Sequence, residues 1–203
     1  TCHCCPQLPN ASFAPLSVSL DFMPFEEMKI KGAWVHTPLR HHDNRGHFEE
    51  QFKLSLIEKD LGRTFTVKQV NQSVSNKGVI RGVHYTDSPE GQAKYVSCPK
   101  GKIWDVVVDL RKGSATYGQW DAVELSAENG LSVFLSEGLG HAFLSLEDGS
   151  VVNYLCSSEY NAAADRTVNA FDPKLAIAFS KIGEKHGIFE FLLSPKDSEA
   201  PSF

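Results

Sequence analysis

Apolar and polar residues alternate in short segments along the chain from about residue 29 onward. Such alternation is typical of β-strands that bury one face. The clearest examples are residues 64–71, 79–85, 102–110, 120–125, 131–135 and 151–155. Turn-forming residues separate these segments, for instance at 75–78, 128–130 and 147–149. Short strands at near-regular spacing predict a β-sandwich or β-barrel.

Two parts of the chain depart from this alternation. Leu54, Ile57 and Leu61 recur at helical spacing, which predicts one short helix near residues 53–61. From about Phe171 onward, Pro and charged residues are frequent and the periodicity is weak, so we expect short helical turns that wrap the barrel. The length of 203 residues favours a single domain.

The first 27 residues differ in composition from the rest. Cys2, Cys4 and Cys5 crowd the start, but no second Cys or His cluster follows at zinc-site spacing. A basic segment followed by an apolar core is also missing, which argues against a secretory signal. We expect residues 1–27 to be a disordered leader and residues 28–203 to form the single domain.

The overall composition excludes several classes of protein. A hydrophobic fraction of 41% and a charged fraction of 22% are ordinary for a soluble globular protein. The net charge of −5 argues against a nucleic-acid partner, and no apolar run approaches the ~20 residues of a membrane helix. Cys98 and Cys156 stand alone in apolar surroundings, as expected of buried thiols in a cytoplasmic protein.

Cationic and titratable residues gather within the strand-like segments. Arg81 and His84 are three residues apart, so both can point into a barrel only if a bulge at Gly82 interrupts the alternation. Lys94 and His141 follow in later segments. Such groups are costly inside a barrel unless they bind something. An anion binder, a proton acceptor and an oxyanion stabiliser together predict proton abstraction next to a carbonyl.

A series of motifs identifies a known family. They are 43–46 (Asp-Asn-Arg-Gly), 69–71, 78–84, 92–96, 105–111, 118–120, 136–141, 154–160 and 193–197. In this order and spacing, the chain resembles the dTDP-4-dehydrorhamnose 3,5-epimerase family from about Lys29 to Phe203. The resemblance implies an all-β, cupin-type jelly roll, a β-barrel or sandwich with a few short helices. It also implies an isomerase that needs no metal and no other cofactor.

The resemblance further implies roles for individual residues. His84 matches the general base, Asp197 the carboxylate that orients this base, and Lys94 the group beside the C4 oxygen. Tyr154 matches the acid on the opposite face of the sugar. The positions that bind the nucleotide sugar in the family correspond to Arg45, Phe48, Glu50, Gln69, Asn71, Arg81, His141, Tyr160 and Asp165. Phe48 and Tyr160 match residues that pack the thymine.

Some positions depart from the family pattern without removing a catalytic group. His47 stands where the family usually has an apolar residue, and Asp165 replaces a frequent Glu. The chain ends at Phe203, where many members continue into a further helical segment.

The implied reaction is epimerisation at C3 and C5 of dTDP-4-dehydro-6-deoxy-D-glucose to dTDP-4-dehydro-L-rhamnose, in dTDP-rhamnose biosynthesis. Three alternatives stay open. A monofunctional 3- or 5-epimerase of a secondary-metabolite pathway would use the same residues on a dTDP-4-keto-6-deoxyhexose. A non-catalytic cupin that binds a nucleotide sugar would not need an acid and a base. A metal-dependent cupin oxygenase would need a His-x-His pair, but residues 82–86 contain only His84, and the Lys94 ammonium would repel a cation.

The resemblance also implies a homodimer. In the family, an N-terminal strand of one subunit joins the sheet of its partner. Such exchange would cover an edge strand that otherwise invites aggregation. We expect this strand near Lys29–Pro38.

Overall fold

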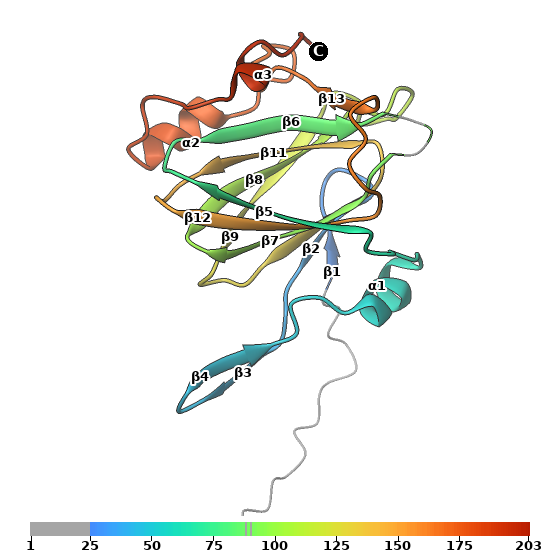
Figure 1. The fold of residues 1–203 in the computed structure, drawn as a ribbon, viewed down its shortest axis with the longest axis vertical. Coiled ribbons are helices and arrows are strands. Elements are labelled where there is room, and N and C mark those ends of the chain that lie inside the picture. The colour runs from blue at the N-terminus through green and yellow to red at the C-terminus, as the bar shows by residue number, and fades with distance from the viewer. Residues whose placement is uncertain (1–24, 88, 90) are drawn as a thin grey trace, which may run out of the picture.

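Two antiparallel β-sheets face each other in the computed structural model, which describes residues 25–87, 89 and 91–203. The six-stranded sheet has the order β1 (Phe25–Glu27), β2 (Ala33–His36), β10 (Ser132–Leu135), β7 (Lys94–Lys100), β12 (Ser150–Cys156) and β5 (Gln69–Ser75). The five-stranded sheet has the order β13 (Asp165–Thr167), β6 (Ile80–Thr86), β11 (Leu139–Ser145), β8 (Lys102–Asp109) and β9 (Trp120–Ser126). Figure 1 shows the sheets stacked as a sandwich, which confirms the predicted all-β fold class.

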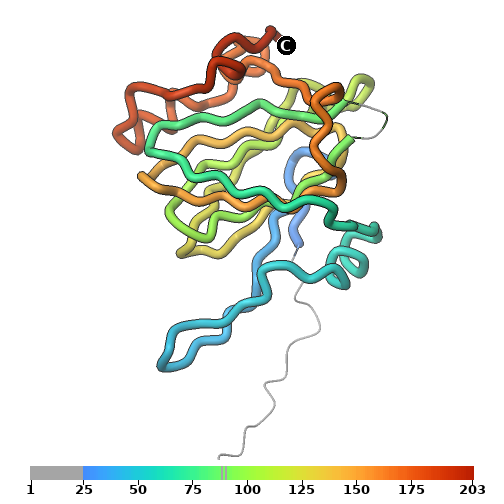
Figure 2. The backbone as a smooth tube through the Cα atoms, viewed as in Figure 1, coloured from blue at the N-terminus to red at the C-terminus, as the bar shows by residue number. Residues whose placement is uncertain are grey.

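The remaining two strands form a hairpin outside the sandwich. Figures 1 and 2 show this hairpin, β3 (Arg40–Asp43) and β4 (Gly46–Glu49), projecting away from both sheets. The predicted helix follows as α1 (Leu54–Leu61), and its Ile57 is fully buried in a cluster with Phe65 and Tyr95. Within the described residues, no helix has the length and apolar character needed to span a membrane.

Strand β1 corrects the predicted boundary between leader and domain. Phe25 pairs with His36 of β2, and the two rings stack with their centroids 4.7 Å apart. Only 4% of Phe25 is exposed, so residues 25–27 belong to the domain and not to a 27-residue leader. A three-residue strand is too short to show alternation, and it is stabilised by its pairing with β2. Residues 1–24 of the predicted leader lie outside the described residues.

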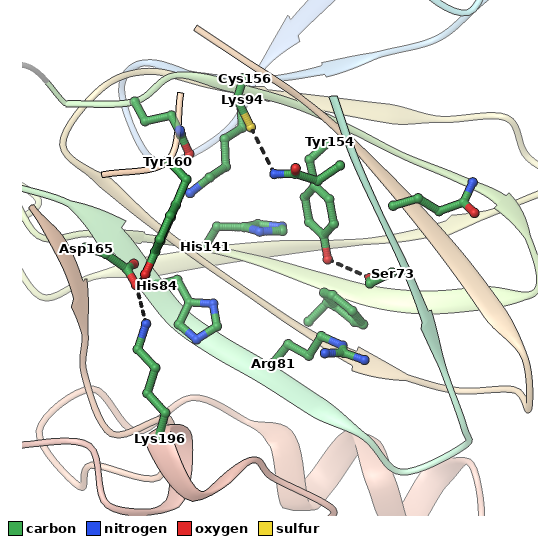
Figure 3. A pocket seen from close by; sticks show the side chains of 14 residues that line it. Ser73, Arg81, His84, Lys94, His141, Tyr154, Cys156, Tyr160, Asp165 and Lys196 are labelled. Atoms are coloured by element: carbon green, nitrogen blue, oxygen red, sulfur yellow. Dashed lines mark hydrogen bonds and ion pairs between the residues drawn. The ribbon is translucent and has the colours of Figure 1, made fainter. Parts of the chain in front are cut away.

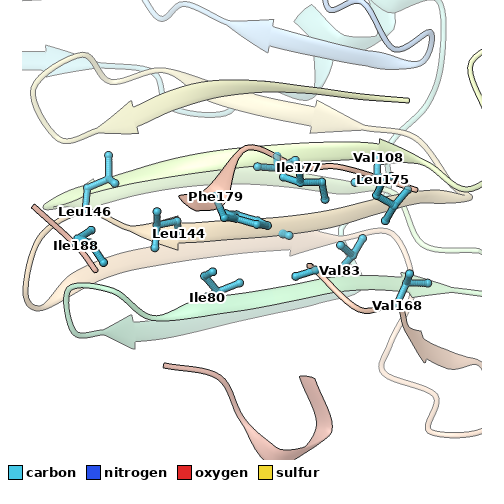
Figure 4. Close-up of a cluster of buried hydrophobic side chains, with 13 residues drawn as sticks. Ile80, Val83, Val108, Leu144, Leu146, Val168, Leu175, Ile177, Phe179 and Ile188 are labelled. Carbon is cyan, nitrogen blue, oxygen red and sulfur yellow. The ribbon is translucent and has the colours of Figure 1, made fainter. Parts of the chain in front are cut away.

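The C-terminal segment covers the outer face of the five-stranded sheet. It contains α2 (Phe179–Lys185) and α3 (Pro195–Ser198), which are the predicted short helical turns. Figure 4 shows Phe179 of this segment among buried residues that include Leu144 of β11. The ring of Phe179 also meets Trp104 edge-on at a centroid distance of 5.4 Å. Burying a side chain of this size contributes about 1.5–3 kcal/mol to the stability of the fold. This packing fixes the C-terminal segment against the sheet, and α3 of the same segment contacts β6.

A second apolar cluster fills the space between the two sheets. Ile103, Val107 and Leu139 of the five-stranded sheet meet residues of the opposite sheet such as Val96 and Val133. Arg81, His84, Lys94 and His141 instead line a cavity in the same sandwich. The fold therefore combines an apolar core with a polar cavity.

Candidate active site

A cavity of about 310 Å³ receives side chains from both sheets. Figure 3 shows the arrangement of its walls. The lining residues are Asn71, Gln72, Ser73, Arg81, His84, Gln92, Lys94, His141, Phe143, Tyr154, Cys156, Tyr160, Asp165 and Lys196. The structure thus brings together most of the site residues predicted from the sequence, although these extend from Asn71 to Asp165 in the chain.

A bulge in β6 places Arg81 and His84 in the same cavity. His84 pairs with His141 and Arg81 pairs with Phe143, so three steps along β6 match two steps along β11. This extra residue is the predicted bulge. Gly82 lies within it with a φ of +113°, and a Cβ there would come within 2.4 Å of the His141 carbonyl oxygen. Only glycine therefore fits this position without strain.

His84 forms a close pair with the carboxylate of Asp197. Its Nε2 lies 2.6 Å from Asp197 Oδ1, and Asp197 is only 3% exposed. Asp197 is held in turn by α3, where its backbone N–H donates to Ser194 Oγ at 3.2 Å. Burial opposes ionisation of Asp197, but its interactions with His84 and Ser194 outweigh burial and lower the pKa of this carboxyl group. The pair therefore favours an ionised carboxylate that can stabilise an imidazolium.

Lys94 brings a positive charge into the cavity from β7. The cavity walls enclose its ammonium, and this desolvation lowers the pKa of Lys94, although the nearby Cys156 and Asp165 act in the opposite direction. Among the described residues, no carboxylate forms an ion pair with Lys94 Nζ. A cation enclosed in this way is suited to meet negative charge on a ligand.

Tyr154 enters the cavity from β12. Its hydroxyl lies 3.0 Å from Ser73 Oγ, and burial raises the pKa of the phenol above its usual range. Its ring meets His141 edge-on, with the centroids 5.9 Å apart. His141 is itself paired with the fully buried Asp105, Nε2 to Oδ2, at 2.6 Å. The cavity therefore contains a neutral phenol and a second His–Asp pair.

Polar contacts also organise the cavity mouth. Lys196 forms an ion pair with Asp165, which accepts a hydrogen bond from the Tyr160 hydroxyl at 3.4 Å. Gln69 accepts from the Tyr160 backbone N–H at 2.7 Å and donates to Asn71 Oδ1 at 2.7 Å. Gln69 thus acts here by supporting its neighbours rather than by lining the cavity.

Three further predicted binding residues lie away from the cavity of their own chain. Arg45 and Phe48 lie on the projecting hairpin, and Glu50 follows it; all three are exposed. Arg45 is paired with Asp43, and Glu50 accepts from Lys53 Nζ at 2.9 Å. Figure 1 shows how far the hairpin stands from the sandwich. Sequence matching cannot reveal this separation, because it does not specify where an excursion from the sheet points.

Sequence reasoning missed Ser73, Asp105 and Lys196 as members of the site. Lys196 directly precedes Asp197 in a motif that was recognised, and Asp105 begins another. Ser73 is two positions beyond Asn71 in a strand, so alternation alone would have placed it on the same face. Among the described residues, no group of three or more His, Cys, Asp or Glu side chains is arranged to hold a metal ion.

Comparisons with known proteins show the family to which the chain belongs. A family model described as dTDP-4-dehydrorhamnose 3,5-epimerase matches residues 27–203. The enzyme of that name from Mycobacterium tuberculosis is 44% identical over 181 residues, which cover 89% of this chain and 88% of the relative. A dTDP-4-dehydro-6-deoxyglucose 3-epimerase from Streptomyces bikiniensis is 45% identical over 175 residues, 86% of each chain. The solved M. tuberculosis RmlC epimerase superposes with a TM-score of 0.83 at 43% identity, covering 88% of this chain and 87% of that one.

Proposed function

The chain belongs to the dTDP-4-dehydrorhamnose 3,5-epimerase family, and from this premise we propose that it inverts C3 and C5 of dTDP-4-dehydro-6-deoxy-D-glucose. The product is dTDP-4-dehydro-L-rhamnose, and the chain is an isomerase of cupin-type jelly-roll fold. One observation carries the proposal: His84, paired with Asp197, shares its cavity with Lys94 and Tyr154, which come from the opposite sheet.

His84 is the proposed general base. Asp197 Oδ1 accepts a hydrogen bond from Nε2–H, which fixes the tautomer and leaves the lone pair on Nδ1 to take a proton from the sugar. The ionised Asp197 then stabilises the imidazolium that forms. This pairing orients the ring and makes proton abstraction from a weakly acidic carbon less costly.

Lys94 is proposed to stabilise the enolate. Removal of a proton next to the C4 ketone places negative charge on O4, and this charge must be met where it develops. The enclosed ammonium of Lys94 offers a preorganised donor, so we expect the reaction to need neither a metal nor an organic cofactor. Burial strengthens the interaction because little water competes for O4.

Tyr154 is the proposed acid for the opposite face of the sugar. Inversion requires that the new proton arrive from the side opposite to the base. His84 belongs to the five-stranded sheet and Tyr154 to the six-stranded sheet, so the two groups approach a bound sugar from different walls. Because burial raises the pKa of Tyr154, the phenol keeps its proton until the enolate carbon takes it.

The nucleotide part of the substrate is assigned to the cavity mouth. The diphosphate is negatively charged, and Arg81 and Lys196 present cationic groups there. Tyr160 is 64% exposed and offers an aromatic face for the thymine. Binding energy from these remote contacts would help to position the reacting sugar.

An epimerase that inverts C3 alone is the second candidate. The 3-epimerase from S. bikiniensis is 45% identical to this chain, and the M. tuberculosis 3,5-epimerase is 44% identical. Proton NMR of the substrate in D₂O with purified protein separates the possibilities. Deuterium at both C3 and C5 supports the double epimerase, and deuterium at C3 alone supports the second candidate. Absence of deuterium at both carbons, with the nucleotide sugar bound, would indicate a binding protein instead.

We further propose that the protein works as a homodimer in which the hairpin of one subunit completes the cavity of the other. Arg45, Phe48 and Glu50 match binding positions of the family but stand outside the cavity of their own chain. A partner subunit would place them against the nucleotide. Exposed apolar side chains on the edge strand β5, Val70 (64%) and Val74 (59%), would be covered by such an association.

The cytoplasm is the proposed location. Cys98 and Cys156 are free and buried, as expected where thiols remain reduced. The net charge of −5 offers no general attraction to nucleic acid, so the nucleotide sugar and a second copy of the chain are the proposed partners.

A further inference from the structure

The Tyr154 hydroxyl has a defined hydrogen-bond partner on the neighbouring strand. In the pairing of β12 with β5, Tyr154 stands opposite Asn71, and Ser73 is the next residue on the same face. This diagonal position brings Ser73 Oγ to 3.0 Å from Tyr154 Oη, the contact drawn as a dashed line in Figure 3. Both side chains line the cavity.

The direction of this hydrogen bond matters for an acid. A phenol has one proton, so a Tyr154 that donates to Ser73 has none available for a sugar carbon. Ser73 can instead donate to Tyr154 Oη and leave the phenolic proton free. Among the described residues, Ser73 Oγ has no other hydrogen-bond partner, so no competing acceptor holds its proton.

We propose that Ser73 is a positioning residue for Tyr154, and the proposal rests on the function assigned above. The Ser73 hydroxyl donates to Tyr154 Oη, so that the phenolic proton faces the sugar. The same donor then stabilises the phenolate that remains after protonation. This residue therefore sets how often abstraction by His84 ends in inversion rather than in return of a proton to the original face.

The bonds and protons of this step balance. The electron pair of the enolate forms the new C–H bond, the O–H bond of Tyr154 breaks, and its electron pair stays on Oη. His84 still holds the proton it abstracted. Loss of that proton to water and gain of one by Tyr154 restore both residues, so the cycle needs no further reactant.

The surroundings of the phenol support this role. Ser73 and the positive charge of Arg81 both lower the pKa of Tyr154, against the larger effect of burial. The next inward residue of β5, Ser75, accepts from Arg81 Nε at 3.1 Å. Alternate residues of one strand thus hold the proposed acid and the cation beside it.

Substitution of Ser73 tests the reaction side of the proposal. In Ser73→Ala, formation of inverted product should fall by roughly 10- to 100-fold, while the KM and solvent exchange by His84 stay near wild type. Exchange without inversion should therefore become dominant. Ser73→Thr, which keeps the hydroxyl, should recover most of the product, and Ser180→Ala on the exposed surface of α2 should behave as wild type. Wild-type inversion in Ser73→Ala, or equal loss of exchange and inversion, would overturn the proposal.

A second measurement tests the hydrogen bond without turnover. A ring-fluorinated tyrosine at position 154, whose phenol is more acidic, can be titrated by ¹⁹F NMR with and without Ser73→Ala. Loss of a donor to the phenolate should make the phenol bind its proton about tenfold more tightly. An unchanged titration would refute the Ser73 assignment. A wild-type protein that neither exchanges nor inverts the substrate would refute the proposed function instead, and the titration would still decide whether Ser73 donates.

Discussion

Ion pairing and burial give the cavity residues different electrostatic environments, although the residues share one small space. His84 has an ionised carboxylate at 2.6 Å, whereas Lys94 is enclosed with no ion-pair partner among the described residues. Tyr154 keeps its proton because burial disfavours the phenolate. These differences fit the proposed roles of base, oxyanion stabiliser and acid, because proteins assign such roles at neutral pH through the environment of each group.

The first prediction concerns the base. His84→Ala should nearly abolish both deuterium exchange and turnover, because it removes the imidazole proposed to take the proton from the sugar. Asp197→Asn should cost less, since Asp197 orients the ring and does not transfer the proton. Both variants should still bind dTDP, measured by calorimetry as a check on folding. Exchange at the wild-type rate in His84→Ala would exclude His84 as the base.

Replacement of Lys94 should separate chemistry from binding. In Lys94→Met the side-chain length is kept but the charge is lost, so kcat should fall by roughly 10²- to 10³-fold. Affinity for dTDP, which lacks the sugar, should stay within about twofold. Loss of dTDP affinity with unchanged kcat would place Lys94 at the nucleotide and not at O4.

Elements differ in how well the sequence revealed them. The β6 bulge was predictable because Arg81 and His84 could not otherwise share a cavity, and α1 was predictable from three apolar residues on one face. Strand β1 was not predictable, because three residues are too few to show an alternation of apolar and polar side chains. The orientation of the hairpin was also hidden, since it depends on contacts such as that between Arg40 and the turn at residues 127–128. Local periodicity predicts elements, but it does not predict where an element leaves the sheet.

Strand β2 gives the fold a dependence on pH. Burial is the main reason that the pKa of His36 falls from 6.5 to about 4. Above pH 6.5 neither the folded nor the unfolded state binds this proton, so stability is unaffected. Between pH 6.5 and pH 4 the unfolded chain takes up a proton that the folded protein excludes, and stability falls by at most about 1.4 kcal/mol per pH unit.

Urea unfolding at pH 7.5 and pH 5.5 measures this effect. The free energy of unfolding should be lower at pH 5.5, and His36→Gln should remove part of the difference. The partly exposed His186, which lies outside the six-stranded sheet, provides a control, because His186→Gln should leave the difference intact. A His36→Gln protein with the full wild-type pH dependence would show that another group is responsible.

At the scale of the whole molecule, one chain holds a reaction cavity but only part of the predicted nucleotide site. His84, Lys94 and Tyr154 meet within the sandwich, whereas Arg45 and Phe48 extend beyond it on the hairpin. Such a division fits the proposed symmetric dimer, in which each subunit would both receive and supply a hairpin. The proposed arrangement makes each complete site depend on two copies of the chain.

Mixing two inactive variants tests this dependence. His84→Ala damages the cavity and Arg45→Ala damages the hairpin, so each homodimer should be impaired in turnover. After joint refolding, half of the dimers are mixed, and each mixed dimer contains one site with an intact His84 and an intact partner hairpin. Activity should therefore return to roughly a quarter of wild type. A mixture that stays as impaired as its components, although light scattering shows dimers, would mean that each hairpin serves its own chain.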